Sequence, residues 1–255
     1  SVNTDSESAD YARIDAVLVE ALRLRPAMPF APAEASMDPS PWLGRYVPAP
    51  SRFAIQSYPD LLTGGFSLTS HSGGFALTPF MGSAIGLAPA GGHLLRADGC
   101  VAPSHILLRD ADGTPMLSDG MRSFRLIGTA ELTLLWLALG LGVAGLLYFL
   151  VVAPILAWRH GRAVIGPGTG GVLGLVGAAL VFQRQSFASL GDSSLANMAL
   201  AAATLLLPLA MVWQAIAAIA ARHMHWRPTL IASLVVLVLC ATLAAHGLMP
   251  LMLWR

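Results

Sequence analysis

The sequence contains no lysine, and all fifteen of its basic residues are arginine. Because a guanidinium does not deprotonate in proteins, arginine cannot replace the amine that lysine offers as a base or nucleophile. This absence excludes lysine Schiff-base chemistry and the lysine-activated serine of Ser-x-x-Lys enzymes. Cysteine is almost absent too. Cys100 falls in a polar stretch and Cys240 in an apolar one, so we expect two free thiols rather than a disulfide or a metal cluster.

Charge is scarce as well. Only 11% of the 255 residues are charged, 55% are hydrophobic, and the formal net charge is +1. With a mean hydropathy of +0.66, this composition is typical of an integral membrane protein. The near-neutral balance indicates no nucleic-acid partner. We expect the lipid bilayer to be the main environment of the chain.

Long apolar runs in the second half predict four transmembrane helices. The run 132–158 carries no charged side chain and exceeds the roughly 20 residues that cross a bilayer core. Three similar runs follow, and the predicted spans are 132–158, 163–182, 195–221 and 228–254. Residues 129–255 are therefore predicted to form a transmembrane domain.

Arginine placement predicts the orientation of these spans. Arg159 and Arg162 lie between the first and second spans, and Arg222 and Arg227 lie between the third and fourth. Since positive charge stays on the cytoplasmic side, the first half of the chain and both termini are expected to face outward. In a bacterium this places them on the periplasmic side of the inner membrane. The chain begins at Ser1 with no visible signal peptide, so the export signal is expected upstream or already removed.

The outward-facing half divides into two predicted parts. Residues 1–41 read as an amphipathic helix, 9–24, followed by a proline-rich linker,. Residues 42–128 alternate short half-apolar segments with Gly-Gly and Asp-Gly turns at roughly ten-residue spacing, which is typical of a small antiparallel sheet or barrel. The predicted fold class is thus a membrane protein of α+β type, with a small antiparallel β-sheet or barrel domain followed by a four-helix transmembrane bundle.

Two features of the apolar half are candidate interaction sites. Small residues recur every four positions in the second span and line one helical face, namely Gly166, Gly170, Gly174 and Ala178. Such a face allows close helix approach in lipid, so we expect packing within the bundle, with a dimer seam or a groove for a partner's helix as the alternative. His246 is a polar candidate inside the last apolar run,. Because no predicted span contains a carboxylate that could pair with His246, we expect this histidine to have a structural role rather than a role in proton transport.

Three patterns in the sequence are of residue types that could carry chemistry. The His71-Ser72-Gly73-Gly74 segment is similar to an edge-strand triplet of penicillin-recognising serine hydrolases, but without lysine we interpret it as a turn. Ser1 as an N-terminal nucleophile is disfavoured by the polar tail that follows it. The remaining histidines lack zinc-hydrolase spacing: His93, His105, His160, His223 and His225. The sequence predicts no catalytic, cofactor-binding or metal-binding residue.

The outer domain resembles a known module. Residues 43–48, LGRYVP, are similar to the G-x-Y segment that opens the C-terminal β module of membrane-bound serine hydrolases and peptidases of the β-lactamase/penicillin-binding-protein superfamily. Residues 94–98 and 105–120 resemble its closing strands. In that family a catalytic domain precedes a β module and several transmembrane helices. The resemblance covers essentially the whole chain, as the family's non-catalytic tail.

The resemblance implies a non-catalytic membrane-anchoring and substrate-orienting portion of a periplasmic serine hydrolase or peptidase. Catalysis would then belong to a partner subunit or to a domain upstream of Ser1. The alternative is an accessory subunit of an unrelated membrane complex, docking through the glycine-rich second span and the outer β domain. Two further alternatives stay open, namely that the chain forms a homo-oligomer and that it is a sensor whose β domain binds a small ligand.

Overall fold

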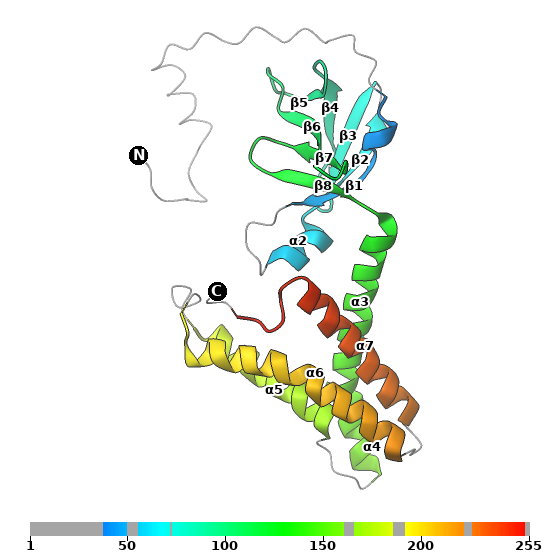
Figure 1. Ribbon diagram of the computed structural model, residues 1–255, viewed down its shortest axis with the longest axis vertical. Coiled ribbons are helices and arrows are strands. Elements are labelled where there is room, and N and C mark those ends of the chain that lie inside the picture. The colour runs from blue at the N-terminus through cyan, green and yellow to red at the C-terminus, as the bar shows by residue number, and fades with distance from the viewer. Residues whose placement is uncertain are drawn as a thin grey trace.

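The computed structural model describes residues 38–49, 56–71, 73–160, 166–185, 192–221 and 226–252. A β-barrel lies at one end of a set of long helices, with a short helix between them (Figure 1). The amphipathic helix and linker predicted for 1–41 fall almost wholly outside the described residues. So do Ser1, Ser72, Arg162, Arg222, His223 and His225.

The outer domain is a closed eight-stranded antiparallel barrel, which confirms the predicted small antiparallel β domain. Each strand pairs with the next along the chain, and β8 closes the barrel by pairing with β1 through Arg45 opposite Ile127. Closure leaves no unpaired sheet edge. The strands are β1 (Gly44–Pro48), β2 (Phe66–His71), β3 (Gly74–Pro79), β4 (Ile85–Pro89), β5 (Leu94–Ala97), β6 (His105–Arg109), β7 (Pro115–Ser118) and β8 (Ser123–Ile127).

Alternating apolar residues fill the barrel interior. Phe66 and Leu68 on β2 are both buried, with the half-buried Ser67 between them and the exposed Thr69 after them. The ring of Phe66 stacks on Tyr46 with centroids 5.4 Å apart and meets Phe124 edge-on at 4.9 Å. An eight-stranded barrel is just wide enough for such side chains. The interior is therefore a packed core, completed by Trp42, Phe75, Leu77, Leu87, Leu95, Ala97, Leu107 and Leu117.

The predicted Asp-Gly turns connect the later strands. Gly113 and Gly120 have φ values of 85° and 84°, in the left-handed region that favours glycine. The preceding aspartates accept backbone hydrogen bonds: Asp112 Oδ1 from the Thr114 N–H at 2.8 Å, and Asp119 Oδ1 from the Met121 N–H at 2.9 Å. Each aspartate thus stabilises the turn that its glycine makes sterically allowed.

The helices begin directly after the barrel. Helix α3 (Thr129–Leu147), the π-helical segment η3 (Tyr148–Val152) and α4 (Ala153–Arg159) form one apolar stretch of 31 residues. Pro154 has no N–H to continue the α-helical bonding, and the π segment lies immediately before it. The stretch extends slightly beyond the predicted 132–158. Helices α6 (Leu195–Ala221) and α7 (Trp226–Ala245) follow after α5 (Pro167–Gln183).

Among the described residues, three helices are long and apolar enough to cross a membrane: α3 to α4, α6 and α7. Helix α5 has 17 residues, about 25 Å at 1.5 Å per residue, slightly less than the 30 Å core of a bilayer. It starts at Pro167 rather than at the predicted 163, with Gly166 in extended conformation before it. Proline at the first helical position is a common start.

The fourth predicted span, 228–254, continues beyond the end of α7 at Ala245. Gly247 has a φ of 73°, its N–H donates to Ala244 O at 3.0 Å, and the Leu248 N–H donates to Leu243 O at 2.8 Å. This pair of bonds is a Schellman motif, which satisfies the last carbonyls of a helix and ends it. The predicted span ended later than α7 because apolar residues continue after Gly247.

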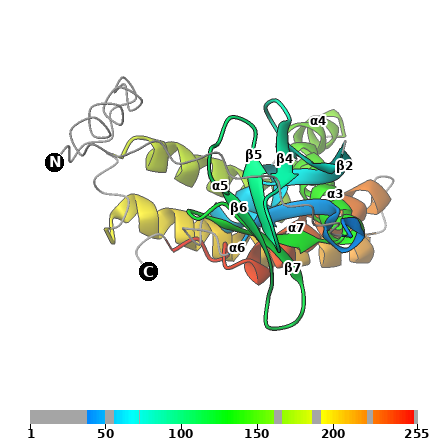
Figure 2. The same ribbon diagram turned by 90° about the horizontal axis from the view of Figure 1, so that it is seen from above.

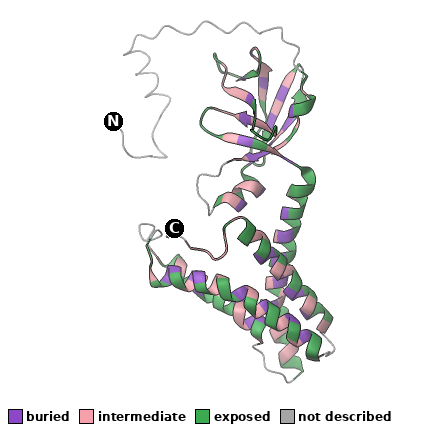
Figure 3. Cartoon of the chain, viewed as in Figure 1, coloured by how far each residue is buried: buried purple, intermediate pink, exposed green. Residues whose placement is uncertain are grey.

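The helices pack as two antiparallel pairs, α3 with α7 and α5 with α6, joined where α6 lies against α7. Seen from above, the α5–α6 pair extends to one side of the barrel (Figure 2). Their shared core contains Phe149, Val172, Leu207, Met211, Ala232, Val236 and Cys240. Wide exposed stripes remain on the outer faces of the helices (Figure 3), with apolar side chains such as Leu141 (53% exposed) and Ile216 (62% exposed).

Helix α2 (Ser57–Thr63) joins the barrel to the long helices, and we had predicted no helix there. Its Tyr58 hydroxyl is buried and donates to Leu135 O of α3 at 2.9 Å. An apolar cluster surrounds this bond, which we call the junction cluster: Val47, Tyr58, Leu62, Ile127 and Leu135, with Leu61, Leu132, Leu139, Leu243 and Leu248 packed against it. The barrel and the helices are thus joined by a shared core.

Candidate functional site

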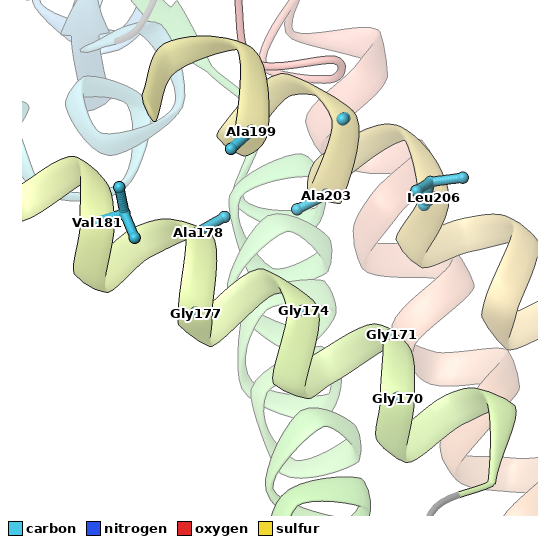
Figure 4. Close-up of a pocket in the computed structure, with 10 residues that line it drawn as sticks. Gly170, Gly171, Gly174, Gly177, Ala178, Val181, Ala199, Ala203 and Leu206 are labelled. Carbon is cyan, nitrogen blue, oxygen red and sulfur yellow. The ribbon is translucent and has the colours of Figure 1, made fainter. Parts of the chain in front are cut away.

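A surface groove lies between α5 and α6, as Figure 4 shows. It has a volume of about 380 Å³. Small residues on both helices form its walls and leave it shallow and apolar. The lining residues are Gly170, Gly171, Gly174, Gly177, Ala178, Val181, Ala199, Ala202, Ala203 and Leu206. We call this the glycine groove.

The predicted glycine stripe divides between contact and open space. A Cβ added at Gly166 would lie 3.1 Å from Gln214 Oε1, and Ala178 is buried. A Cβ added at Gly174 would meet nothing within 4 Å. The tight contacts of α5 come from Gly168 and Gly171 instead, where a Cβ would approach the Phe149 ring to 2.7 Å and Ala210 Cβ to 2.8 Å. The stripe is therefore only partly a packing face.

A close approach of α3 to α7 was not predicted from the sequence. On α3, a Cβ at Gly145 would lie 2.8 Å from methyl groups of Val235 and Val236 and 2.9 Å from Ala232 O. Gly142 would similarly collide with Leu239. A signal was present, because Ala138, Gly142 and Gly145 recur at spacings of four and three, which places them on one face.

Polar side chains also hold α5 against α6. The Gly168 N–H at the start of α5 donates to Gln214 Oε1 of α6 at 3.0 Å, which satisfies one of the free donors at a helix start. At the other end, Gln185 bonds Asn197 Oδ1 at 3.3 Å and accepts from Ser194 Oγ at 2.8 Å. Asn197 is buried, and its amide donates to Asp192 O. The Gly168–Gln214 bond joins residues 46 positions apart, so no local pattern indicated it.

His246 lies one residue after α7, at the junction cluster. Its Nδ1 is 2.8 Å from Thr242 O, and its ring meets Tyr58 at 5.3 Å in an edge-on arrangement. Its carbonyl accepts a hydrogen bond from Ser57 Oγ at 3.2 Å. These contacts connect the end of α7 to α2, and the structural role of His246 stays a prediction.

A second apolar hollow, of about 310 Å³, lies between α6, α7 and the segment after α7. Pro208 lies within α6 here, and the Thr204 hydroxyl one turn before it accepts from the Leu251 N–H at 3.2 Å. Cys240 lines the hollow and is buried, whereas Cys100 is exposed on the barrel; both thiols are free. The segment after α7 is thereby held against α6.

The outer histidines lie apart from one another in the barrel. His71 is exposed and pairs with Gly74 at the end of the β2–β3 hairpin, with Gly73 at a φ of 82°, so the predicted turn is confirmed. His93 lies beside Trp42, with ring centroids 5.6 Å apart. No group of three or more His, Cys, Asp or Glu side chains gathers in a metal-binding arrangement within the residues that the structure describes.

Acid is expected to destabilise the barrel through His105. Burial lowers the pKa of His105 below its ordinary 6.5, and its Nδ1 lies 2.9 Å from Ser104 Oγ. Below pH 6.5 the unfolded chain therefore binds a proton that the folded barrel resists, so stability present above 6.5 is lost as the pH falls. After correction for the intrinsic pH dependence of hydrogen exchange, the β6 amides should be less protected at pH 5.5 than above pH 6.5.

The His105→Gln variant should lose this extra acid sensitivity, and His71→Gln, at an exposed site, should retain it. Equal acid sensitivity in His105→Gln and the unaltered chain would contradict the assignment to His105.

No protein-family model, curated protein or solved structure matches this chain.

Proposed function

We propose that this chain is the non-catalytic, membrane-anchoring and substrate-orienting portion of a periplasmic serine hydrolase or peptidase of β-lactamase-like type. In this proposal α3 to α7 form a four-helix transmembrane bundle in a bacterial inner membrane. The barrel stands on the periplasmic side. The reactive serine is supplied by a partner subunit or by a domain that precedes Ser1 in the same protein.

The observation that carries the proposal is the junction cluster. A simple tether needs only one apolar helix followed by a loose linker. Here the barrel enters the helices without a linker, and β1, α2, α3 and α7 all contribute side chains to one core. A domain attached to this barrel would be held at a set height and angle above the lipid, which suits an enzyme whose substrate is presented at the membrane.

Charge placement supports the orientation. Arg159 ends α4 and Arg227 stands in the first turn of α7, and these helix ends lie opposite the barrel (Figure 1). Because basic residues favour the cytoplasmic side, the barrel would face outward. Helix α5, slightly short for a full span, packs against α6 and would cross with local thinning of the bilayer.

The hydrolase assignment rests on the resemblance of residues 43–48, 94–98 and 105–120 to the β module of that superfamily. The test is to purify the whole chain in mild detergent from a bacterial membrane that contains its native neighbours, and to treat the sample with a fluorophosphonate probe. We expect the probe to label a co-purifying protein, or an upstream domain of the same polypeptide. Labelling within residues 1–255 would contradict a non-catalytic role.

A second candidate is an accessory subunit of an unrelated membrane complex, and the glycine groove favours it. Gly174 and Gly177 have open space where a Cβ would stand, and close backbone approach through small residues is how helices associate in lipid. The occupant would be one apolar helix of the partner. In this case the co-purifying protein carries no reactive serine, and Gly174→Leu releases it; in the first case Gly174→Leu leaves the labelled hydrolase bound.

A further inference from the structure

The turn between β3 and β4 carries an exposed apolar surface that the barrel fold does not require. Every residue from 80 to 85 is exposed, and the sequence is FMGSAI. Phe80 is 43% exposed, Met81 83% and Ile85 41%. Large apolar side chains gathered in one turn have an unfavourable contact with water. The position of this turn relative to α3 indicates what could cover its apolar side chains.

The turn lies against the first turns of α3. The Phe80 ring stacks on Trp136 with centroids 6.1 Å apart and planes 21° from parallel. Trp136 itself is 39% exposed, so this pair is open to the surroundings of the helix. Tyr58 and Leu135 occupy the neighbouring face of α3, and the turn therefore stands beside the junction cluster rather than within it.

The depth of this contact follows from the helix geometry. Glu131 forms an exposed ion pair with Arg125 at 3.8 Å, which places that level in water or among headgroups. Trp136 comes five positions later on α3, about 7.5 Å further along the helix axis. The polar layer on each side of the bilayer core is roughly 5 to 8 Å thick, and tryptophan prefers that layer. Phe80, which stacks on Trp136, thus reaches the same depth, and the exposed Met81 follows it in the chain.

Arg45 lies over the Phe80 ring and has few hydrogen-bond acceptors among the described residues. Its guanidinium carbon is 5.4 Å from the centroid of Phe80, and its Nη1 donates to Ser67 Oγ over 3.5 Å. Its Nε is buried with no acceptor among the described residues. A guanidinium has five N–H donors in a planar fork that suits phosphate. At this depth, the acceptor that a bilayer supplies is a lipid phosphate.

We propose that Arg45, Phe80, Met81 and Trp136 form a phospholipid-headgroup site, in which the β3–β4 turn enters the outer leaflet and Arg45 binds a lipid phosphate. This site rests on the membrane placement proposed above. It gives the barrel a direct contact with lipid, in addition to its connection through the helices.

The position of the turn can be measured with single nitroxide labels on the whole chain in phosphatidylethanolamine and phosphatidylglycerol vesicles, in a Cys100→Ser, Cys240→Ala background. Met81→Cys tests the turn. Met121→Cys is its matched control, because Met121 is also 83% exposed and lies at the end of β8 away from α3. Leu141→Cys, on an exposed face of α3, tests the membrane placement itself.

We expect oxygen to relax the labels at 81 and 141 more strongly than a water-soluble nickel chelate does, and the reverse at 121. If 141 reports lipid and 81 matches 121, the headgroup site is wrong while the membrane placement stands. If 141 reports water, the membrane placement and the headgroup site are both wrong.

The phosphate contact has its own test. After purification from the same vesicles, native mass spectrometry should find phosphatidylglycerol retained by the unaltered chain and by Arg122→Gln, a control on the turn before β8. Arg45→Gln should retain about tenfold less, the effect expected from losing a charge-assisted bond to phosphate. Equal retention by Arg45→Gln and Arg122→Gln would overturn the assignment of Arg45.

Discussion

Replacing Tyr58 with alanine is expected to separate the barrel from the helices. Tyr58 is 3% exposed, its hydroxyl donates to Leu135 O at 2.9 Å, and its ring packs edge-on against His246. Removing a large buried aromatic side chain costs about 3 to 5 kcal/mol. Because α2 is short and Tyr58 gives it a hydrogen bond to α3, most of that loss should fall on the attachment of the barrel rather than on either part alone.

The measurement is a distance distribution between a label on native Cys100, which is exposed on the barrel, and one at Leu141→Cys on α3, with Cys240→Ala. The unaltered chain should give a narrow distribution and Tyr58→Ala a broad one. Tyr58→Phe is the matched control: it keeps the ring and loses one hydrogen bond, about 1 kcal/mol, so its distribution should stay narrow. A narrow distribution in Tyr58→Ala would show that the rest of the junction cluster suffices.

A second large effect is expected from Gly145→Leu. A single Cβ at Gly145 already falls 2.8 Å from the Val236 methyl and 2.9 Å from Ala232 O. Backbone cannot move aside as the end of a flexible side chain can, so α3 and α7 must separate to admit leucine. Overpacking by smaller changes costs about 1 to 3 kcal/mol, and we expect Gly145→Leu to reach or exceed about 3 kcal/mol.

Gly140→Leu provides the control on the same helix. Its Cβ would meet nothing within 4 Å, and leucine has a better helix propensity than glycine by roughly 0.8 kcal/mol. Unfolding in mixed micelles with increasing dodecyl sulfate should show Gly145→Leu unfolding at much lower dodecyl sulfate, with Gly140→Leu at or above the unaltered chain. Equal loss in both variants would mean that the face of α3 carrying Gly145 is not its contact with α7.

The local sequence could predict the features that depend on the composition of one segment or on residues a few positions apart. Apolar runs predicted α3, α6 and α7 because length and hydropathy are properties of one segment. Asp112-Gly113 and Asp119-Gly120 predicted turns because an aspartate acceptor followed by a left-handed glycine acts within four residues. The apolar alternation of β2 and β3 similarly follows from the two-residue period of a strand.

The features that we missed depend on contacts between distant segments. Helix α2 has seven residues and little reason to form until Tyr58 meets Leu135. Closure of the barrel joins Arg45 to Ile127, which no local pattern contains. Gly142 and Gly145 could have been recognised as a small-residue face, but only the partner α7 makes it tighter than the glycine groove. The sequence analysis thus named small residues on α5, whereas tight glycine contacts also lie on α3.

The Schellman turn after α7 has a consequence for the order of assembly. Leu243 and Leu248, on either side of Gly247, pack against residues that were synthesised almost two hundred positions earlier, around Tyr58. During biosynthesis the barrel can close as soon as Ile127 emerges. The junction cluster, however, is complete only when α7 and the residues after it have been synthesised. A chain truncated before that point would carry a folded barrel on an incomplete junction cluster. The apolar side chains of α2 would then be exposed, and a quality-control protease could recognise them.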